Sequence, residues 1–122
     1  MEAFIHIIHG TEADTNYTSR QGRLTCKFDD LIEVFGQPLK DGFDTYKCDA
    51  QWDLDLRRIG FPARSTVATI YNYKNGQAYC GSDAPPVRDI TDWSVGGHSH
   101  EAVELIETLL KQNDIEHTIQ FD

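Results

Sequence analysis

Hydrophobic and polar residues alternate most regularly between Lys47 and Leu56. The apolar side chains occupy every second position of this segment: Cys48, Ala50, Trp52, Leu54 and Leu56. Successive side chains of a strand point to opposite faces of a sheet. The alternation therefore predicts a strand with one buried and one polar face, as in an antiparallel sheet.

Five further segments have the composition or the alternation of strands. They are residues 3–10, 23–28, 66–74, 88–95 and 115–121. Residues 66–74 carry bulky side chains on both faces, which predicts a central strand. Residues 11–22 are polar, and we expect a loop there.

Two segments have the period of helices. The first, from Asp29 to Phe35, has a predicted cap at Asp29 and a glycine stop at Gly36. The second follows Gly97, with Ser99 as its predicted cap. Its apolar positions recur at the spacing of a buried stripe: Ala102, Leu105, Ile106, Leu109 and Leu110. The predicted fold is α+β: an antiparallel sheet of about five to six strands, one long C-terminal helix on one face, and one short helix.

Length and composition restrict the class of protein. The 122 residues carry no internal repeat or linker, so we expect a single domain over residues 1–122. Three widely spaced cysteines are typical of reduced thiols in a reducing compartment. The chain has neither an apolar run of about 18 residues nor a signal peptide at its start, which predicts a cytoplasmic protein and no membrane partner.

The charge limits the partners further. Twenty acidic and 11 basic side chains give a formal net charge of −9. Nucleic acid and anionic membranes would be repelled over most of such a surface, so we expect no direct binding of nucleic acid. A ligand that carries phosphate would need a local cationic pocket.

Gly96 and Gly97 stand at the predicted junction between a strand and the long helix. The first amides of a helix have no partners within it and carry partial positive charge, so backbone alone can hold an anion there. Gly96, Gly97, His98 and Ser99 are therefore candidate ligand-binding residues. The alternative is a tight turn closed by a serine cap.

Tyr71 and Tyr73 share one face of the predicted central strand. A tyrosine ring offers a flat surface on which a base can stack. The Gly-, Asp- and Pro-rich segment 75–87 is long for a hairpin turn, and it supplies Asp83 as a polar partner. The nearby cations are Lys47, Arg57, Arg58, Lys74 and Arg88. Alternating tyrosines are also common as half-buried residues of a sheet.

Three other chemistries receive less support. The pair His98 and His100, with His6 from another strand, could hold a metal, but no carboxylate stands at a recognisable spacing. Cys80 has no catalytic signature around it. We therefore assign no catalytic residue, no metal and no cofactor. The row Asp49, Asp53 and Asp55 could imitate nucleic acid or form a solvated strand face.

Several of these motifs together resemble one family. They are Phe35-Gly36-Gln37-Pro38, the Trp-bearing acidic strand, Ala68-Thr-Ile-Tyr-Asn-Tyr-Lys74, and Trp93-Ser-Val-Gly-Gly97 before a helix. This combination, over roughly residues 23 to 110, is similar to phage sponges that block the Thoeris defence system by sequestering cyclic ADP-ribose signals.

The resemblance implies a non-enzymatic phage protein that binds a small nucleotide signal in the host cytoplasm and assembles into dimers or larger rings. It places the stacking ring at Tyr71 or Tyr73, a polar contact at Asp83, and a phosphate clamp after the two glycines. An arginine and a threonine would be expected in that clamp, where this chain has His98 and Ser99. Either the missing charge comes from Lys47 or an arginine such as Arg57, or this chain prefers a different ligand.

Two other functions stay open. One is an acidic inhibitor, or nucleic-acid mimic, that binds a host defence protein or a nucleic-acid-binding protein. The other is a small metal-dependent hydrolase.

Overall fold

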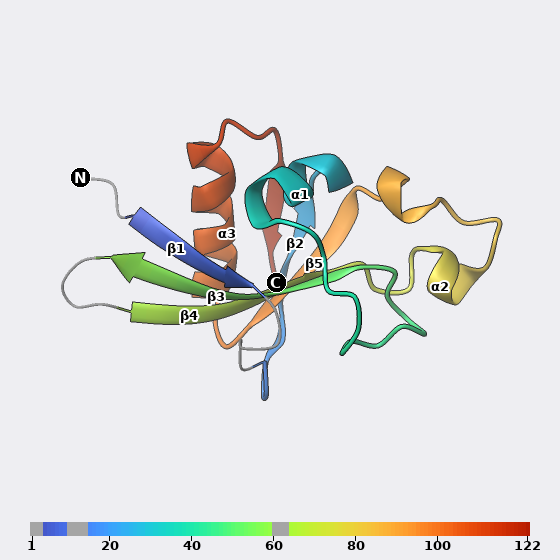
Figure 1. Ribbon diagram of the computed structural model, residues 1–122, viewed down its shortest axis with the longest axis horizontal. Coiled ribbons are helices and arrows are strands. Elements are labelled where there is room, and N and C mark those ends of the chain that lie inside the picture. Colours follow the sequence, from blue (N-terminus) through green and yellow to red (C-terminus); the bar gives the residue numbers. More distant parts are fainter. Residues whose placement is uncertain (1–3, 10–14, 60–63) are drawn as a thin grey trace.

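The centre of the protein is an antiparallel sheet of six strands (Figure 1). The computed structural model describes residues 4–9, 15–59 and 64–122. Across the sheet the order is β1-β3-β4-β5-β2-β6. The strands are β1 (Phe4–His9), β2 (Ser19–Thr25), β3 (Gln51–Ile59), β4 (Arg64–Tyr71), β5 (Asp92–Gly97) and β6 (Thr118–Phe121).

The helices confirm the predicted α+β class. The short α1 (Phe28–Phe35) and the long α3 (Glu101–Gln112) supply buried side chains to one core on the same face of the sheet. A single-turn helix, α2 (Gln77–Cys80), and the 3-10 turn η1 (Val87–Asp89) lie in the segment between β4 and β5. Figure 1 shows α2 beyond the end of the sheet, away from α3.

The core fills the space between the sheet and the two longer helices. Trp52 and Trp93 are at most 2 % exposed and meet edge to face, with ring centroids 5.4 Å apart. Each indole also donates a hydrogen bond: Trp52 Nε1 to the Gly36 carbonyl at 2.8 Å and Trp93 Nε1 to the Cys26 carbonyl at 3.0 Å. Both tryptophans thus tie the segments that flank α1 to the sheet, and the donors of these large side chains are satisfied.

The predicted alternation is confirmed in β3 and its approach. All five apolar positions from Cys48 to Leu56 are buried. The stripe predicted for the long helix is buried too, together with Val103. β4 has neighbours on both sides, as its two bulky faces predicted.

Some boundaries predicted from sequence are wrong. β2 begins at Ser19, within the segment expected to be a loop. The cap of α1 is Lys27, and Asp29 lies in the first turn, where its charge favours the helix dipole. Gly36 does end α1, and its φ of 84° is a positive value that favours glycine. The connection between β3 and β4, residues 60–63, lies outside the described residues.

The junction at the two glycines also differs from the prediction. Gly96 and Gly97 are the last residues of β5 and belong to the sheet, not to a strand-to-helix turn. His100 is the cap position of α3, and the hydroxyl of Ser99 accepts a 3.3 Å hydrogen bond from the Glu101 amide. Ser99 therefore satisfies one free amide of the first turn, close to the role predicted for it.

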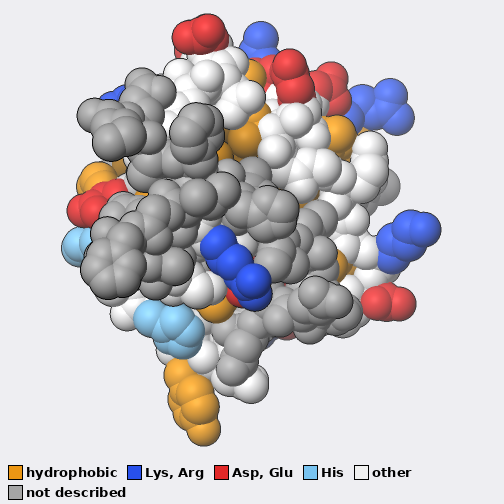
Figure 2. Space-filling view, turned by 60° about the vertical axis from the view of Figure 1, so that its left-hand side comes forward, with side chains coloured by type: hydrophobic (Ala, Val, Ile, Leu, Met, Phe, Trp, Pro, Cys, Tyr) orange, Lys and Arg blue, Asp and Glu red, His pale blue; other side chains and the backbone are white. Residues whose placement is uncertain are grey.

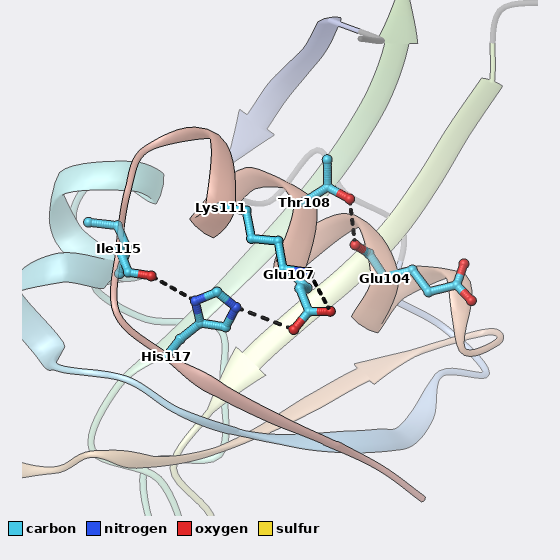
Figure 3. Close-up of polar contacts among 6 residues, drawn as sticks. All are labelled: Glu104, Glu107, Thr108, Lys111, Ile115 and His117. Atoms are coloured by element: carbon cyan, nitrogen blue, oxygen red, sulfur yellow. Dashed lines mark hydrogen bonds and ion pairs between the residues drawn. The ribbon is translucent and has the colours of Figure 1, made fainter.

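His117 ties the approach of β6 to α3 (Figure 3). Its Nε2 lies 3.3 Å from a carboxylate oxygen of Glu107, and its Nδ1 lies 2.7 Å from the Ile115 carbonyl. Lys111 pairs with the other oxygen of Glu107 at 3.5 Å. Both ring nitrogens of this largely buried histidine therefore face oxygen atoms.

No helix in the described part of the chain combines the length and apolar composition needed to cross a membrane.

Candidate functional site

The face of the sheet opposite α3, here called the open face, carries polar side chains in cross-strand rows. One row joins Ser94, Arg23 and Gln120 on β5, β2 and β6. The next row joins Asp92, Thr25 and Thr118 on the same strands. Rows two residues apart along a strand are about 6.8 Å apart, so these groups can act together on one ligand.

An irregularity in β2 places two arginines on this face. Arg20 and Arg23 are three positions apart in the sequence, and regular alternation would put them on opposite faces. The pairing with β5 shifts between Arg20 and Gly22, so Arg20 pairs with Gly96 and Arg23 with Ser94. Both partners belong to the open face, and the bulge therefore brings the two guanidinium groups to one side.

These residues enclose a cavity of about 430 Å³, which we call the arginine cavity. Its described lining comprises Arg20, Arg23, Leu24, Thr25, Tyr73, Asn75, Asp92, Trp93, Ser94, Thr118 and Gln120. The volume falls in the usual range of roughly 300–1,000 Å³ for small-molecule sites.

The two arginines are held differently. Arg20 Nε donates a 2.6 Å hydrogen bond to a carboxylate oxygen of Asp122, and this contact raises the pKa of Arg20. The side chain of Arg23 has no hydrogen-bond or ion-pair partner among the described residues. Its guanidinium can therefore meet an anion without first breaking an internal bond.

Tyr71 and Tyr73 form an edge-to-face pair, with centroids 6.4 Å apart and an angle of 88°. Tyr71 is partly buried, and burial is the first cause that raises the pKa of its phenol. Tyr73 is 46 % exposed. The ammonium groups of Lys74 and Lys47 lie 5.2 and 5.9 Å from the centre of its ring, which adds positive charge beside the arginine cavity.

A second cavity, of about 220 Å³, adjoins the first at Tyr73, and we call it the hydroxyl cavity. Its described lining comprises Thr15, Thr18, Ser19, Asp44, Cys48, Gln51, Thr69, Tyr71, Tyr73 and Gly96. Hydroxyl groups dominate this set.

Of the predicted binding residues, the structure brings together Tyr71, Tyr73, Gly96 and Lys47. Tyr71 and Gly96 line the hydroxyl cavity, and Tyr73 lines both cavities. Lys47 contacts the Tyr73 ring and pairs with Asp44 at 3.9 Å.

The other predicted binding residues lie apart from the two cavities. Gly97 faces α3, where a side chain would collide with Ala102. His98 and Ser99 are exposed beyond the end of β5. Tyr71 pairs with Ser94, and the four residue steps from Ser94 to His98 correspond to roughly 13 Å of extended chain. The predicted clamp residues His98 and Ser99 therefore lie at the opposite end of β5 from Ser94, which lines the arginine cavity.

Asp83 and Arg57 also stand outside the cavities. Asp83 is exposed on the segment after α2. Arg57 is exposed and makes a 3.4 Å ion pair with Asp55 on the same strand.

Of the three aspartates predicted to form one acidic row, Asp53 and Asp55 share a face of β3, whereas Asp49 lies before the strand. Asp49 precedes β3, and its carboxylate accepts hydrogen bonds from Asn72 Nδ2 at 2.7 Å and the Ala78 amide at 2.9 Å. Asp53 is 7 % exposed, and Asp55 pairs with Arg57. On the side of the molecule in Figure 2, acidic and basic described side chains are interspersed.

Among the described residues, no three His, Cys, Asp or Glu side chains are grouped so that they could hold a metal ion. His98 and His100 are both exposed, and His100 meets the Phe121 ring edge to face. The side chain of His6 lies outside the described residues.

Sequence reasoning missed the residues of β2 and β6 that line the arginine cavity. Arg23 and Thr25 alternate with the buried Leu24 and Cys26, so their polar face was readable. The face on which Arg20 lies could not be predicted, because a single sequence does not show where a bulge occurs. Gln120 joins them only through the pairing of β2 with β6.

Comparisons of this chain with protein-family models, with curated proteins and with solved structures found no match.

Proposed function

We propose that the protein binds a nucleotide signal of the cyclic ADP-ribose type on its open face and sequesters it without cleaving it. The observation that carries the proposal is the arginine cavity, which is lined both by Tyr73 and by Arg23, whose side chain has no ion-pair partner among the described residues. Phosphate, ribose and base are the parts of such a ligand, and each finds a matching group there.

Phosphate would bind Arg23, with Arg20 as a second cation. A guanidinium offers a planar fork of donors that suits phosphate oxygens, and such charge-assisted bonds are stronger than neutral ones. The base would stack on Tyr73, because an exposed tyrosine ring accepts the flat face of any base. Ribose hydroxyls would meet the row of Asp92, Thr25 and Thr118, which offers a carboxylate and two hydroxyls.

The lining of the arginine cavity favours binding over cleavage. Its described residues include no histidine or cysteine, the side chains that most often act as base or nucleophile near neutral pH. Asp92 supplies the carboxylate of this lining, and we assign it a hydrogen bond to a ribose hydroxyl and not a nucleophilic role.

The charge of the chain agrees with a local site. A net charge of −9 disfavours long anionic polymers over most of the surface. A small nucleotide needs to meet only the cavity, where two arginines and the nearby lysines gather.

The test compares Arg23→Gln with Arg88→Gln. Arg88 is exposed on η1 and lies outside both cavities, so its variant makes the same chemical change as a control. Titration with cyclic ADP-ribose isomers by calorimetry should show binding by the wild type and by Arg88→Gln. Loss of a charged hydrogen bond at Arg23 should weaken binding by about 10- to 100-fold.

Two results would contradict the proposal. One is the absence of heat with every isomer for the wild type. The other is equal affinity of the wild type and Arg23→Gln, which would place the nucleotide elsewhere.

A further inference from the structure

The arginine cavity and the hydroxyl cavity have opposite chemistry. Arg20 and Arg23 line the first, whereas no Lys or Arg is among the described residues that line the second. The charged side chain in the described lining of the hydroxyl cavity is Asp44, whose carboxylate pairs with Lys47 at 3.9 Å. An anionic group would therefore find guanidinium partners in the first cavity and no cation in the described lining of the second.

The hydroxyl cavity offers both donors and acceptors. Burial raises the pKa of the Tyr71 phenol, so this group keeps its proton at neutral pH and can donate it in a hydrogen bond. Thr69 is 5 % exposed and contributes a hydroxyl. Gln51 donates its Nε2 to Asp53 at 2.7 Å, which leaves its amide oxygen as an acceptor. Such a set suits an uncharged ring bearing NH and carbonyl groups.

The volume of the hydroxyl cavity limits its occupant. At about 220 Å³ it lies below the range of roughly 300–1,000 Å³ for sites that hold a whole ligand. A cavity of this size holds one part of a larger molecule. Since Tyr73 lines both cavities, that molecule can extend across its ring from one to the other.

We infer that the ligand has two unlike halves: a phosphate-bearing half in the arginine cavity and an uncharged base or nucleoside half in the hydroxyl cavity, with Tyr73 between them. The inference rests on the proposed function and narrows it to ligands in which a phosphate-bearing part and an uncharged base or nucleoside part are far enough apart to occupy both cavities.

The experiment uses a whole probe and a half probe, cyclic ADP-ribose and ribose 5-phosphate. Two variants alter the hydroxyl cavity with little change of shape. Asp44 Oδ1 accepts hydrogen bonds from the backbone amides of Tyr46 and Lys47 at 3.1 and 3.3 Å. Asp44→Asn removes the charge but keeps an oxygen that can accept these two bonds. Thr69→Val removes one hydroxyl. Arg23→Gln alters the arginine cavity, and thermal melts check that every variant is folded.

The inference predicts a split between the probes. Asp44→Asn and Thr69→Val should each lower the affinity for cyclic ADP-ribose by about two- to tenfold, the effect of one hydrogen bond. The affinity for ribose 5-phosphate should not change in either variant. Arg23→Gln should lower the affinity for both probes.

The contrary results separate this inference from the proposed function. Suppose that Arg23→Gln lowers the affinity for cyclic ADP-ribose but Asp44→Asn and Thr69→Val do not. The inference of a two-part ligand is then wrong, and the proposed function stands. If the half probe loses as much affinity as the whole probe in Asp44→Asn and Thr69→Val, the division between the cavities is wrong. If no nucleotide binds the wild type, both proposals fail.

Discussion

The three cysteines have different surroundings. Cys26 and Cys48 are buried, and burial is the first cause that raises the pKa of each thiol to about 11. Neighbouring carboxylates act in the same direction, Asp30 on Cys26 and Asp44 on Cys48. Cys80 is exposed at the end of α2. All three are free thiols.

Brief alkylation at about pH 8 should therefore modify Cys80 and spare the other two, because the thiolate is the reactive form. Intact-mass spectrometry of the native and the unfolded protein measures this directly. Native Cys80→Ser should remain unlabelled under the same conditions, and rapid labelling of that variant would contradict the burial of Cys26 and Cys48.

The same thiols predict a loss of stability in alkali. Their pKa is about 11 in the folded protein against an ordinary value of 9.0. The folded state therefore holds protons that the unfolded state has released, and stability falls as the pH rises from about 9 to about 11. The loss is on the order of 2 kcal/mol per thiol, measurable as a lower urea midpoint. An unchanged midpoint across this pH range would contradict it.

Residue identity predicted much of the core but only part of the site. The alternation around Leu54 and Leu56 marks the buried face because it depends on local strand geometry. The face that Arg20 occupies depends on the irregular pairing of β2 with β5, which is a property of two strands. No pattern within residues 19–25 contains that information.

The packing of neighbouring strands and of α3 explains why glycine occupies positions 96 and 97. A side chain at Gly96 would collide with Thr69 and crowd the ring of Tyr71 on the open face. A side chain at Gly97 would collide with Ala102 of α3 on the other face. The pair therefore admits close neighbours on both sides of the sheet, and an anion-binding turn is not needed to account for it.

Gly97→Ala should lower the free energy of unfolding by about 1–3 kcal/mol, the usual cost of overpacking. In an Ala102→Gly background the same change should cost much less, because the colliding methyl group is gone. Denaturant unfolding of the four proteins gives the coupling energy. A coupling near zero would show that Gly97 is required for another reason.

The contact between His117 and Glu107 joins the approach of β6 to α3 (Figure 3). His117→Ala should remove about 1 kcal/mol of stability, because it deletes a largely buried hydrogen bond. Amide hydrogen exchange should become faster in β6 before it changes in β3 or β4. His98→Ala, at an exposed histidine outside the sheet, is the control and should leave exchange in β6 unchanged. Equal exchange in both variants would contradict this role for His117.

At the scale of the whole molecule, local sequence patterns were sufficient to predict the fold class. Strand alternation and one long amphipathic helix predicted an α+β protein with an antiparallel sheet. The position of β2 between β5 and β6 was not predictable in this way, because that pairing joins segments about a hundred residues apart on one side. The arginine cavity lies on those strands, so its location depended on the same missing information.

If the protein sequesters its ligand, as proposed, the bound nucleotide should be recovered intact when the protein is denatured. The protein should be mixed with cyclic ADP-ribose, freed of unbound nucleotide by gel filtration, heat-denatured, and the supernatant analysed by mass spectrometry. We predict recovery of unchanged cyclic ADP-ribose with the wild type and Arg88→Gln, and little with Arg23→Gln. Recovery of linear ADP-ribose, or of no nucleotide from the wild type, would contradict sequestration at the open face.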